Sequence, residues 1–231
     1  MSELVNYSLN EKVATITISN GKVNALSSAV FTALNAALDQ AEKDNAVVVL
    51  TGQPGMLSAG YDLKEMTSSP DSAAALVKTG STFCHRMMSF PLPIVVACTG
   101  HAVAKGAFLC LSADIRIGAE GPFKIALNEV AIGMTMHHAG IEMARYRMTP
   151  AHFQRSVICA EMFDPQGAVH AGFLDRIVSA ENVLVSAQAE AAKLAELNLR
   201  AHRQTKLKVR EAYLALLAEA IEKDNVSLGL N

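Results

Sequence analysis

Two short apolar runs constrain the fold of this chain more than any other feature. AVVVLTG at 46–52 and PIVVACTG at 93–100 are continuous, rich in β-branched residues and closed by glycine. A strand with one wet face alternates apolar and polar residues, so these uninterrupted runs predict strands that are buried on both faces, as in a parallel sheet. Parallel neighbours need a crossover connection, which is usually a helix. We therefore expect an α/β fold.

The remaining pattern agrees with that alternation. VATITIS at 13–19 has the period of two typical of a half-buried strand, and Ser27 is placed to cap a helix. Residues 1–182 should form a core that carries the functional site, and 183–231 a helical region whose apolar stripe packs on that core or on a partner subunit. We expect helices over 27–43, 73–89, 106–112, 183–199 and 205–223, and further short strands over 115–118 and 174–178.

Composition excludes several classes of function. The 231 residues suffice for one large domain, and 20 basic against 22 acidic residues argue against nucleic-acid binding. No apolar run approaches the roughly 20 residues that cross a bilayer, and the start of the chain lacks a basic and apolar leader. We therefore expect a cytoplasmic protein without a membrane partner. No metal site is predicted, because the cysteines are widely spaced and are expected to be small buried hydrophobes: Cys84, Cys98, Cys110 and Cys159.

Functional groups are expected where the two buried strands end, because ligands of parallel sheets bind at the carboxyl ends of the strands. The first strand leads through the small residues 58–60 to Tyr61, and the second leads through small residues to Lys105. Small residues let the backbone approach a ligand, and two free N–H groups aimed at one oxygen form an oxyanion hole. The alternatives are ordinary turns and, for Lys105, a solvated head on an apolar stem.

A single acid, Glu129, lies in the otherwise apolar run ALNEVAIGM at 126–134. Burying a lone carboxylate costs several kcal/mol unless it is paired, hydrogen-bonded or protonated. Glu129 is therefore either solvated at a turn, as a partly exposed residue at a helix start, or held in place for chemistry. An apolar surround would raise its pKa toward neutrality, which suits a group that accepts and then donates a proton.

Taken together, these segments resemble the enoyl-CoA hydratase/isomerase (crotonase) superfamily. The resemblance implies a spiral of ββα units with two nearly perpendicular sheets, followed by helices that assemble a homotrimer or a dimer of trimers. It also implies acyl-CoA thioester substrates, with coenzyme A as part of the substrate and no other cofactor. The segments that carry it are VNALSSAVF (23–31), MLSAGYDLKEM (56–66), PIVVACTGHAVAKGAFLCLSADIRIG (93–118), LNEVAIGM (127–134) and MFDPQGAVHAGFLDRIVSAENV (162–183).

The resemblance assigns roles to individual residues. The backbone N–H groups of Tyr61 and Lys105 would hold the thioester oxygen, and Glu129 would be the catalytic acid and base. Lys105 stands where the family has the middle glycine of a glycine-rich turn, so its side chain could reach a CoA phosphate or the thioester, or block the acyl channel. The other residues expected to bind substrate are Lys22, Val23, Ala25, Ser58, Ala59, Gly60, Asp62, Leu63, Gly106 and Phe108.

One departure from the family pattern selects among reactions. Hydratases have a second glutamate at the position of Phe108, and Phe can neither position nor deprotonate water. One acid with an oxyanion hole resembles the monofunctional Δ3,Δ2-enoyl-CoA isomerases of fatty acid metabolism, in which Glu129 would take a proton from C2 and return it at C4. The alternatives are a hydratase, hence a lyase, another enolate-forming reaction, or a catalytically weak acyl-CoA-binding protein.

Two groups of basic residues stay open to more than one interpretation. His137 and His138 could face the acyl chain, although placement in the core or at the surface is favoured. Lys206, Lys208 and Arg210 could approach a CoA phosphate, although a solvated helix face is favoured.

Overall fold

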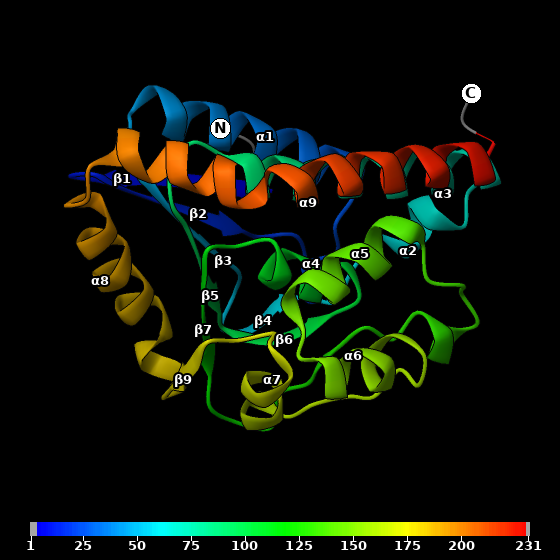
Figure 1. Ribbon diagram of the computed structural model, residues 1–231. Helices are drawn as coiled ribbons and strands as arrows, with labels where there is room; N and C mark the ends of the chain where they lie inside the picture. The colour runs from blue at the N-terminus through cyan, green and yellow to red at the C-terminus, as the bar shows by residue number, and fades with distance from the viewer. Residues whose placement is uncertain (1–3, 230–231) are drawn as a thin grey trace.

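The computed structural model describes residues 4–229 and confirms an α/β fold with two sheets (Figure 1). The larger sheet has the order β1-β2-β3-β5-β7-β9, and all its neighbouring pairs are parallel except β1 with β2. Its strands are β1 (Val5–Asn10), β2 (Val13–Ile18), β3 (Val47–Thr51), β5 (Ile94–Cys98), β7 (Ile115–Ala119) and β9 (Arg176–Val178).

The two apolar runs form β3 and β5, which lie side by side in the middle of the larger sheet. Along β3, Val47 and Val49 face helix α8 (Val183–Ala195), while Val48 and Leu50 belong to the main hydrophobic core on the other side. Side chains of a strand alternate between its two faces, so a strand covered on both sides needs apolar residues at every position. The expectation of doubly buried strands is confirmed.

The smaller sheet consists of β4 (Gly55–Ser58), β6 (Gly100–Val103) and β8 (Ile125–Ala126), all parallel. These strands follow β3, β5 and β7 in the chain, so each of those three strands of the larger sheet continues into a strand of the smaller sheet and then into a helical turn or helix. This repetition is the spiral of ββα units that the resemblance implied. It brings the segments after β4, β6 and β8 together at one end of the smaller sheet.

Helices surround the sheets, and a side chain caps the start of five of those in residues 4–229. The predicted cap is confirmed at Ser27, whose Oγ accepts a hydrogen bond from the backbone N–H of Val30 at 3.3 Å. The helices are α1 (Ser28–Lys43), α2 (Leu63–Met66), α3 (Pro70–Ser89), α4 (Lys105–Leu111), α5 (His138–Arg147), α6 (Pro150–Val157), α7 (Pro165–Ala171), α8 (Val183–Ala195) and α9 (Leu199–Ser227), with short 3-10 turns at Val130–Ile132 and Ala180–Asn182. No helix in residues 4–229 is long and apolar enough to span a membrane.

The C-terminal region differs in detail from its prediction. The first helix ends at Ala195 rather than 199, and α9 begins at Leu199, where the side chain of Asn198 caps it by accepting from the Ala201 N–H at 3.0 Å. The helix then runs to Ser227 and packs along α3 and α5 (Figure 1). Residues 1–3 and 230–231, at the ends of the two predicted regions, lie outside the described residues.

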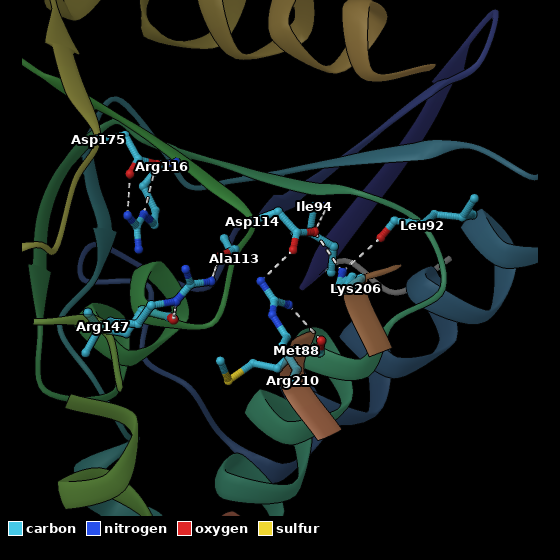
Figure 2. A network of polar contacts seen from close by, with 11 residues as sticks. Met88, Leu92, Ile94, Ala113, Asp114, Arg116, Arg147, Asp175, Lys206 and Arg210 are labelled. Atoms are coloured by element: carbon cyan, nitrogen blue, oxygen red, sulfur yellow. Dashed lines mark hydrogen bonds and ion pairs between the residues drawn. The ribbon is translucent and has the colours of Figure 1, made fainter. Parts of the chain in front are cut away.

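The buried charges of α9 correct one expectation (Figure 2). Lys206 and Arg210 do not lie on a solvated face: Lys206 Nζ is 2.7 Å from one carboxylate oxygen of Asp114, and Arg210 Nη2 is 2.8 Å from the other. Arg210 also donates to the Met88 carbonyl at 2.7 Å, and Asp114 accepts from the Ile94 N–H at 2.8 Å. The ion pairs and hydrogen bonds of both cations therefore hold α9 against the core.

One further expectation fails. Cys159 is exposed, whereas the other three cysteines are buried as predicted. Lys208, by contrast, is exposed as expected of a solvated helix face. The main reason is position: Cys159 follows α6 in a turn at the molecular surface, and a cysteine is apolar enough to be buried without being required to be.

Candidate active site

The two expected oxyanion donors lie on loops that touch. Gly60 has φ +106°, and a Cβ added to it would lie 3.0 Å from the Ala104 Cβ and 3.4 Å from the Lys105 backbone nitrogen. Gly106 has its helix start pressed so closely onto the Ser58 carbonyl that any side chain there would clash. Two glycines thus bring the end of β4 and the start of α4 into contact, and with them the N–H groups of Tyr61 and Lys105.

The backbone at Ala104 is strained where it delivers Lys105 to the site. Ala104 has φ +49° and ψ −123°, a conformation that costs a non-glycine residue on the order of 1–3 kcal/mol. Its N–H is held by the Ala126 carbonyl at 2.9 Å, which ties the end of β6 to the end of β8. Lys105 is the first residue of α4, where a backbone N–H has no partner within the helix. The strained turn therefore aims a free N–H out of the helix.

Glu129 is buried, so it is held inside the protein rather than solvated at a turn. It stands at the start of the 3-10 turn Val130–Ile132, but only 7% of its surface is exposed, and its Oε2 has no hydrogen-bond partner among residues 4–229. Burial raises the pKa of the carboxyl, while a hydrogen bond from its own backbone N–H and the charge of Lys105 act in the opposite direction. The alternative of a partly exposed, solvated acid is wrong.

The side chain of Lys105 points inward and is completely buried. Its Nζ lies 5.4 Å from the ring centre of Phe108 and 5.7 Å from that of Tyr61, with no hydrogen-bond partner within the described part of the chain. The expectation of a solvated head is therefore wrong. The side chain fills interior space between the Tyr61 and Phe108 rings, and its place relative to a bound CoA ester stays a prediction.

Phe108 and His137 close the interior of the site. Phe108 is completely buried, His137 is partly buried with its Nε2 enclosed, and their rings meet edge to face with centres 5.6 Å apart. Burial lowers the pKa of His137 to about 3, with the charges of Lys105 and His138 adding to the effect, so the imidazole is neutral at pH 7. His137 thus lies against Phe108 at the edge of the hydrophobic core, and its position relative to an acyl chain stays a prediction. His138 is the first residue of α5 and is less buried.

The segments expected to line the CoA channel come together. Residues 22–25 run beside 58–60, because the Ala59 N–H donates to the Val23 carbonyl at 3.0 Å and the Ser58 Oγ donates to the Asn24 carbonyl at 2.8 Å. Residues at the mouth are open to solvent: Lys22, Val23, Ala59 and Leu63 are exposed, and Ala25, Tyr61 and Asp62 are partly so. Those further in are buried: Ser58, Gly60, Gly106 and Phe108.

Asp62 has a local task as well. Its Oδ1 accepts from the N–H groups of Lys64 and Glu65, at 2.9 and 3.1 Å, and so caps the short helix α2. The cap fixes where α2 begins, two residues after Tyr61, and thus supports the loop that presents the Tyr61 N–H.

Sequence reasoning overlooked Gly80 in the middle of α3. A Cβ at this position would lie 2.7 Å from Cε1 of Tyr61 and 2.8 Å from Cε of Lys105, so the missing side chain is what accommodates both residues. The available signal was the glycine itself, because a glycine inside a helix costs about 1 kcal/mol relative to alanine and marks a close approach. No cluster of three or more possible metal ligands of the His, Cys, Asp or Glu type occurs among residues 4–229.

Comparisons with known proteins agree with this architecture. The family model for enoyl-CoA hydratase/isomerase matches residues 8–228. A probable enoyl-CoA hydratase of Bacillus subtilis is 32% identical over 83% of this chain and 76% of its own length. Among solved structures, an enoyl-CoA hydratase/isomerase family protein from Pseudomonas syringae is 62% identical with a TM-score of 0.96, covering 98% of both chains.

A second structural neighbour bears an isomerase name. The apo enoyl-CoA isomerase of Mycobacterium tuberculosis is 39% identical with a TM-score of 0.93, covering 98% of this chain and 99% of its own. Hydratase and isomerase names thus both occur among the relatives, so their names do not choose between the two reactions. They do agree on the family, whose substrates are acyl-CoA thioesters. This chain belongs to the enoyl-CoA hydratase/isomerase family.

Proposed function

We propose that this protein is a Δ3,Δ2-enoyl-CoA isomerase in which Glu129 moves one proton between C2 and C4 of the acyl chain. Two observations carry the proposal: Glu129 is buried with no hydrogen-bond partner for its Oε2 among residues 4–229, and the apolar Phe108 stands at the position of the second hydratase acid. A single acid suffices for a proton transfer along one face of the substrate, whereas hydration also requires a bound water.

The reaction begins with the thioester carbonyl against the N–H groups of Tyr61 and Lys105. The Glu129 carboxylate removes a C2 proton, and the electron pair of the C–H bond moves toward the carbonyl to give a dienolate. Negative charge then collects on the oxygen, where two preorganised N–H donors stabilise it; losing one such donor costs about 2.7–4 kcal/mol in known enzymes. Protonated Glu129 returns the proton at C4, which leaves the double bond between C2 and C3.

The test measures both reactions on the same preparation. A 3-enoyl-CoA should be converted to the conjugated 2-enoyl-CoA, with slower hydration of the 2-enoyl thioester. Glu129→Gln should lower the isomerase kcat by about 10²–10⁴-fold, the usual contribution of general acid–base catalysis. The matched control is Glu120→Gln, which alters an exposed glutamate after β7. Unchanged isomerisation in Glu129→Gln, or hydration faster than isomerisation, would contradict the proposal.

Two other functions are outcomes of the same measurement. A hydratase or another enolate-forming enzyme is supported by the name of the Bacillus subtilis relative, and it would use Glu129 with a different partner. A catalytically weak acyl-CoA-binding protein is supported by the Lys105 side chain, which occupies interior space beside the thioester site. Tight binding of CoA esters without turnover would favour this last function.

The assembly and location of the protein stay predictions. Several large apolar side chains of the C-terminal region are exposed in the single chain, as a homotrimer or a dimer of trimers would require: Val185, Leu197, Val209, Leu216 and Val226. The cytoplasmic location rests on the sequence alone.

A further inference from the structure

The ammonium of Lys105 is buried in the site without a hydrogen-bond partner among the described residues. Its side chain is 0% exposed and lies between the Tyr61 and Phe108 rings against Gly80, so it is held in place by packing rather than by an ion pair. A buried cation without a partner is costly, and such a group is expected where its charge is used.

The fold brings the backbone segments that carry Lys105 and Glu129 together. The pairing of Val103 with Ala126 and the hydrogen bond from the Ala104 N–H to the Ala126 carbonyl join the two strand ends, so that Lys105 and Glu129 follow the same junction. No direct contact fixes them, since neither Lys105 Nζ nor Glu129 Oε2 has a hydrogen-bond partner within residues 4–229. The positive charge acts on the carboxyl through a low-dielectric interior and leaves its oxygen free to accept a proton.

Other ionisable groups around Glu129 do not supply this charge. His137, just before α5, is neutral at pH 7, and burial raises the pKa of the Tyr61 phenol well above its usual value, so it is neutral as well. Asp224 of α9 is occupied by the N–H groups of His138 and Ala139, at 2.7 and 2.9 Å. Lys105 is therefore the cation that offsets the burial of the carboxylate.

We propose that the Lys105 ammonium keeps Glu129 ionised between turnovers, and so acts as a positioning residue for the proton shuttle. This inference rests on the proposed function and deepens it. Before the reaction the negative charge is on Glu129, and after removal of the C2 proton it is on the dienolate. A fixed cation whose charge acts on Glu129 would favour the ionised base before the proton is removed. The residue whose N–H binds the oxygen thus also holds the base in its active form.

The experiment compares pH profiles of kcat/KM for isomerisation. Lys105→Met keeps the backbone N–H and a side chain of similar length but removes the charge. The acidic limb of the profile should move to higher pH by about one unit, the lower range for loss of an opposite charge nearby. Activity at a pH below the original limb should then fall about ten-fold, while the plateau at high pH stays within a few-fold of the wild type. Lys78→Met, an exposed lysine on α3, is the matched control with an unmoved limb.

A merely structural Lys105 would give a different result. If Lys105→Met lowers activity equally at every pH with its acidic limb unmoved, the proposal is wrong. Should that variant not fold, Lys105→Gln provides the same test with a polar neutral side chain. Infrared titration of the Glu129 carboxyl, assigned by its absence in Glu129→Gln, gives a readout without turnover: its pKa should rise in Lys105→Met. If the wild type does not isomerise but this shift is seen, the proposed function fails and the role of Lys105 stands; if no shift is seen in an active enzyme, only the role of Lys105 fails.

Discussion

Two buried clusters of charge in this protein are built in opposite ways. Around Asp114, every carboxylate oxygen meets a cation, and the cations also bind backbone carbonyls (Figure 2). Around Glu129, the carboxyl oxygen Oε2, the Lys105 ammonium and the Nε2 of His137 have no hydrogen-bond partners among residues 4–229. A network in which every polar group has a partner fixes one arrangement of its side chains, whereas polar groups without partners can still form hydrogen bonds or ion pairs with a substrate. The first cluster holds the helix, and the second is available for chemistry.

The pKa values of Asp114 and Glu129 shift in opposite directions because one carboxylate is paired with cations and the other is not. Burial alone would raise the pKa of Asp114, but the charges of Lys206 and Arg210 outweigh it and hold the pKa below its usual value. At Glu129, burial outweighs the effects that lower the pKa. Asp114 therefore stabilises the fold above its unfolded pKa, and this contribution is lost as the pH falls through its folded value. Glu129 opposes folding once the pH rises through its folded value.

The largest expected effect comes from breaking the satisfied cluster. Asp114→Ala leaves the Lys206 and Arg210 cations buried without their counter-ion, and removing one partner of a buried pair costs about 3–5 kcal/mol. The free energy of unfolding, measured with denaturant at pH 7, should fall by that amount. The loss should shrink as the pH falls below 3.8, the usual aspartate pKa, because the pKa of Asp114 in the fold lies lower and its stabilisation is lost as the pH falls through it. A loss below about 1 kcal/mol at pH 7 would show that the cluster does not hold α9.

Filling the space at Gly80 should have an intermediate effect. Gly80→Ala places a methyl group against Tyr61 and Lys105, and overpacking of this kind costs about 1–3 kcal/mol, partly offset by the higher helix propensity of alanine. Because both displaced residues belong to the site, kcat should fall more than stability does. Comparison with Ala75→Gly, on the exposed face of the same helix, separates helix propensity from crowding. Unaltered kcat in Gly80→Ala would mean that the site tolerates the shift.

The smallest effect, with the opposite sign, is expected at the unsatisfied cluster. Glu129→Gln removes a buried charge that lacks a partner on Oε2, and should raise the free energy of unfolding at pH 8 by about 1 kcal/mol. Below pH 4.5, where the carboxyl is protonated in both states, the gain should vanish. Parallel denaturant titrations of wild type and variant at these two pH values measure it. If Glu129→Gln is less stable than the wild type at pH 8, the Glu129 carboxylate stabilises the fold and this prediction is wrong.

Local patterns predicted the large sheet well and the small sheet poorly. β3 and β5 were visible because a strand buried on both faces must be apolar throughout. β8 has two residues and β4 and β6 four each, too short for any periodicity, and β1 was passed over although it pairs with β2 over six residues. The resemblance to a family, rather than the pattern of residues, implied the second sheet.

The sequence named the residues of the candidate site, but it did not show what surrounds each of them. Tyr61, Lys105 and Glu129 were named from the sequence, yet the direction of the Lys105 side chain depends on the space above Gly80, 25 residues earlier. The Lys206 and Asp114 partners are 92 residues apart, so the helix pattern alone made Lys206 a surface residue. The hydrophobic pattern of one helix cannot predict that a charged residue is buried when its partner comes from a distant segment.

The strained turn at Ala104 makes two properties of the site inseparable. In the proposed mechanism, any relaxation of its backbone would move the Lys105 amide away from the thioester oxygen and the ammonium away from Glu129. Binding of the oxygen and ionisation of the base would then both depend on the backbone conformation of Ala104. A chain that replaces Lys105 to admit a bulkier acyl group must find a new counter-charge at the same time, which limits the routes by which this pocket can change its substrate.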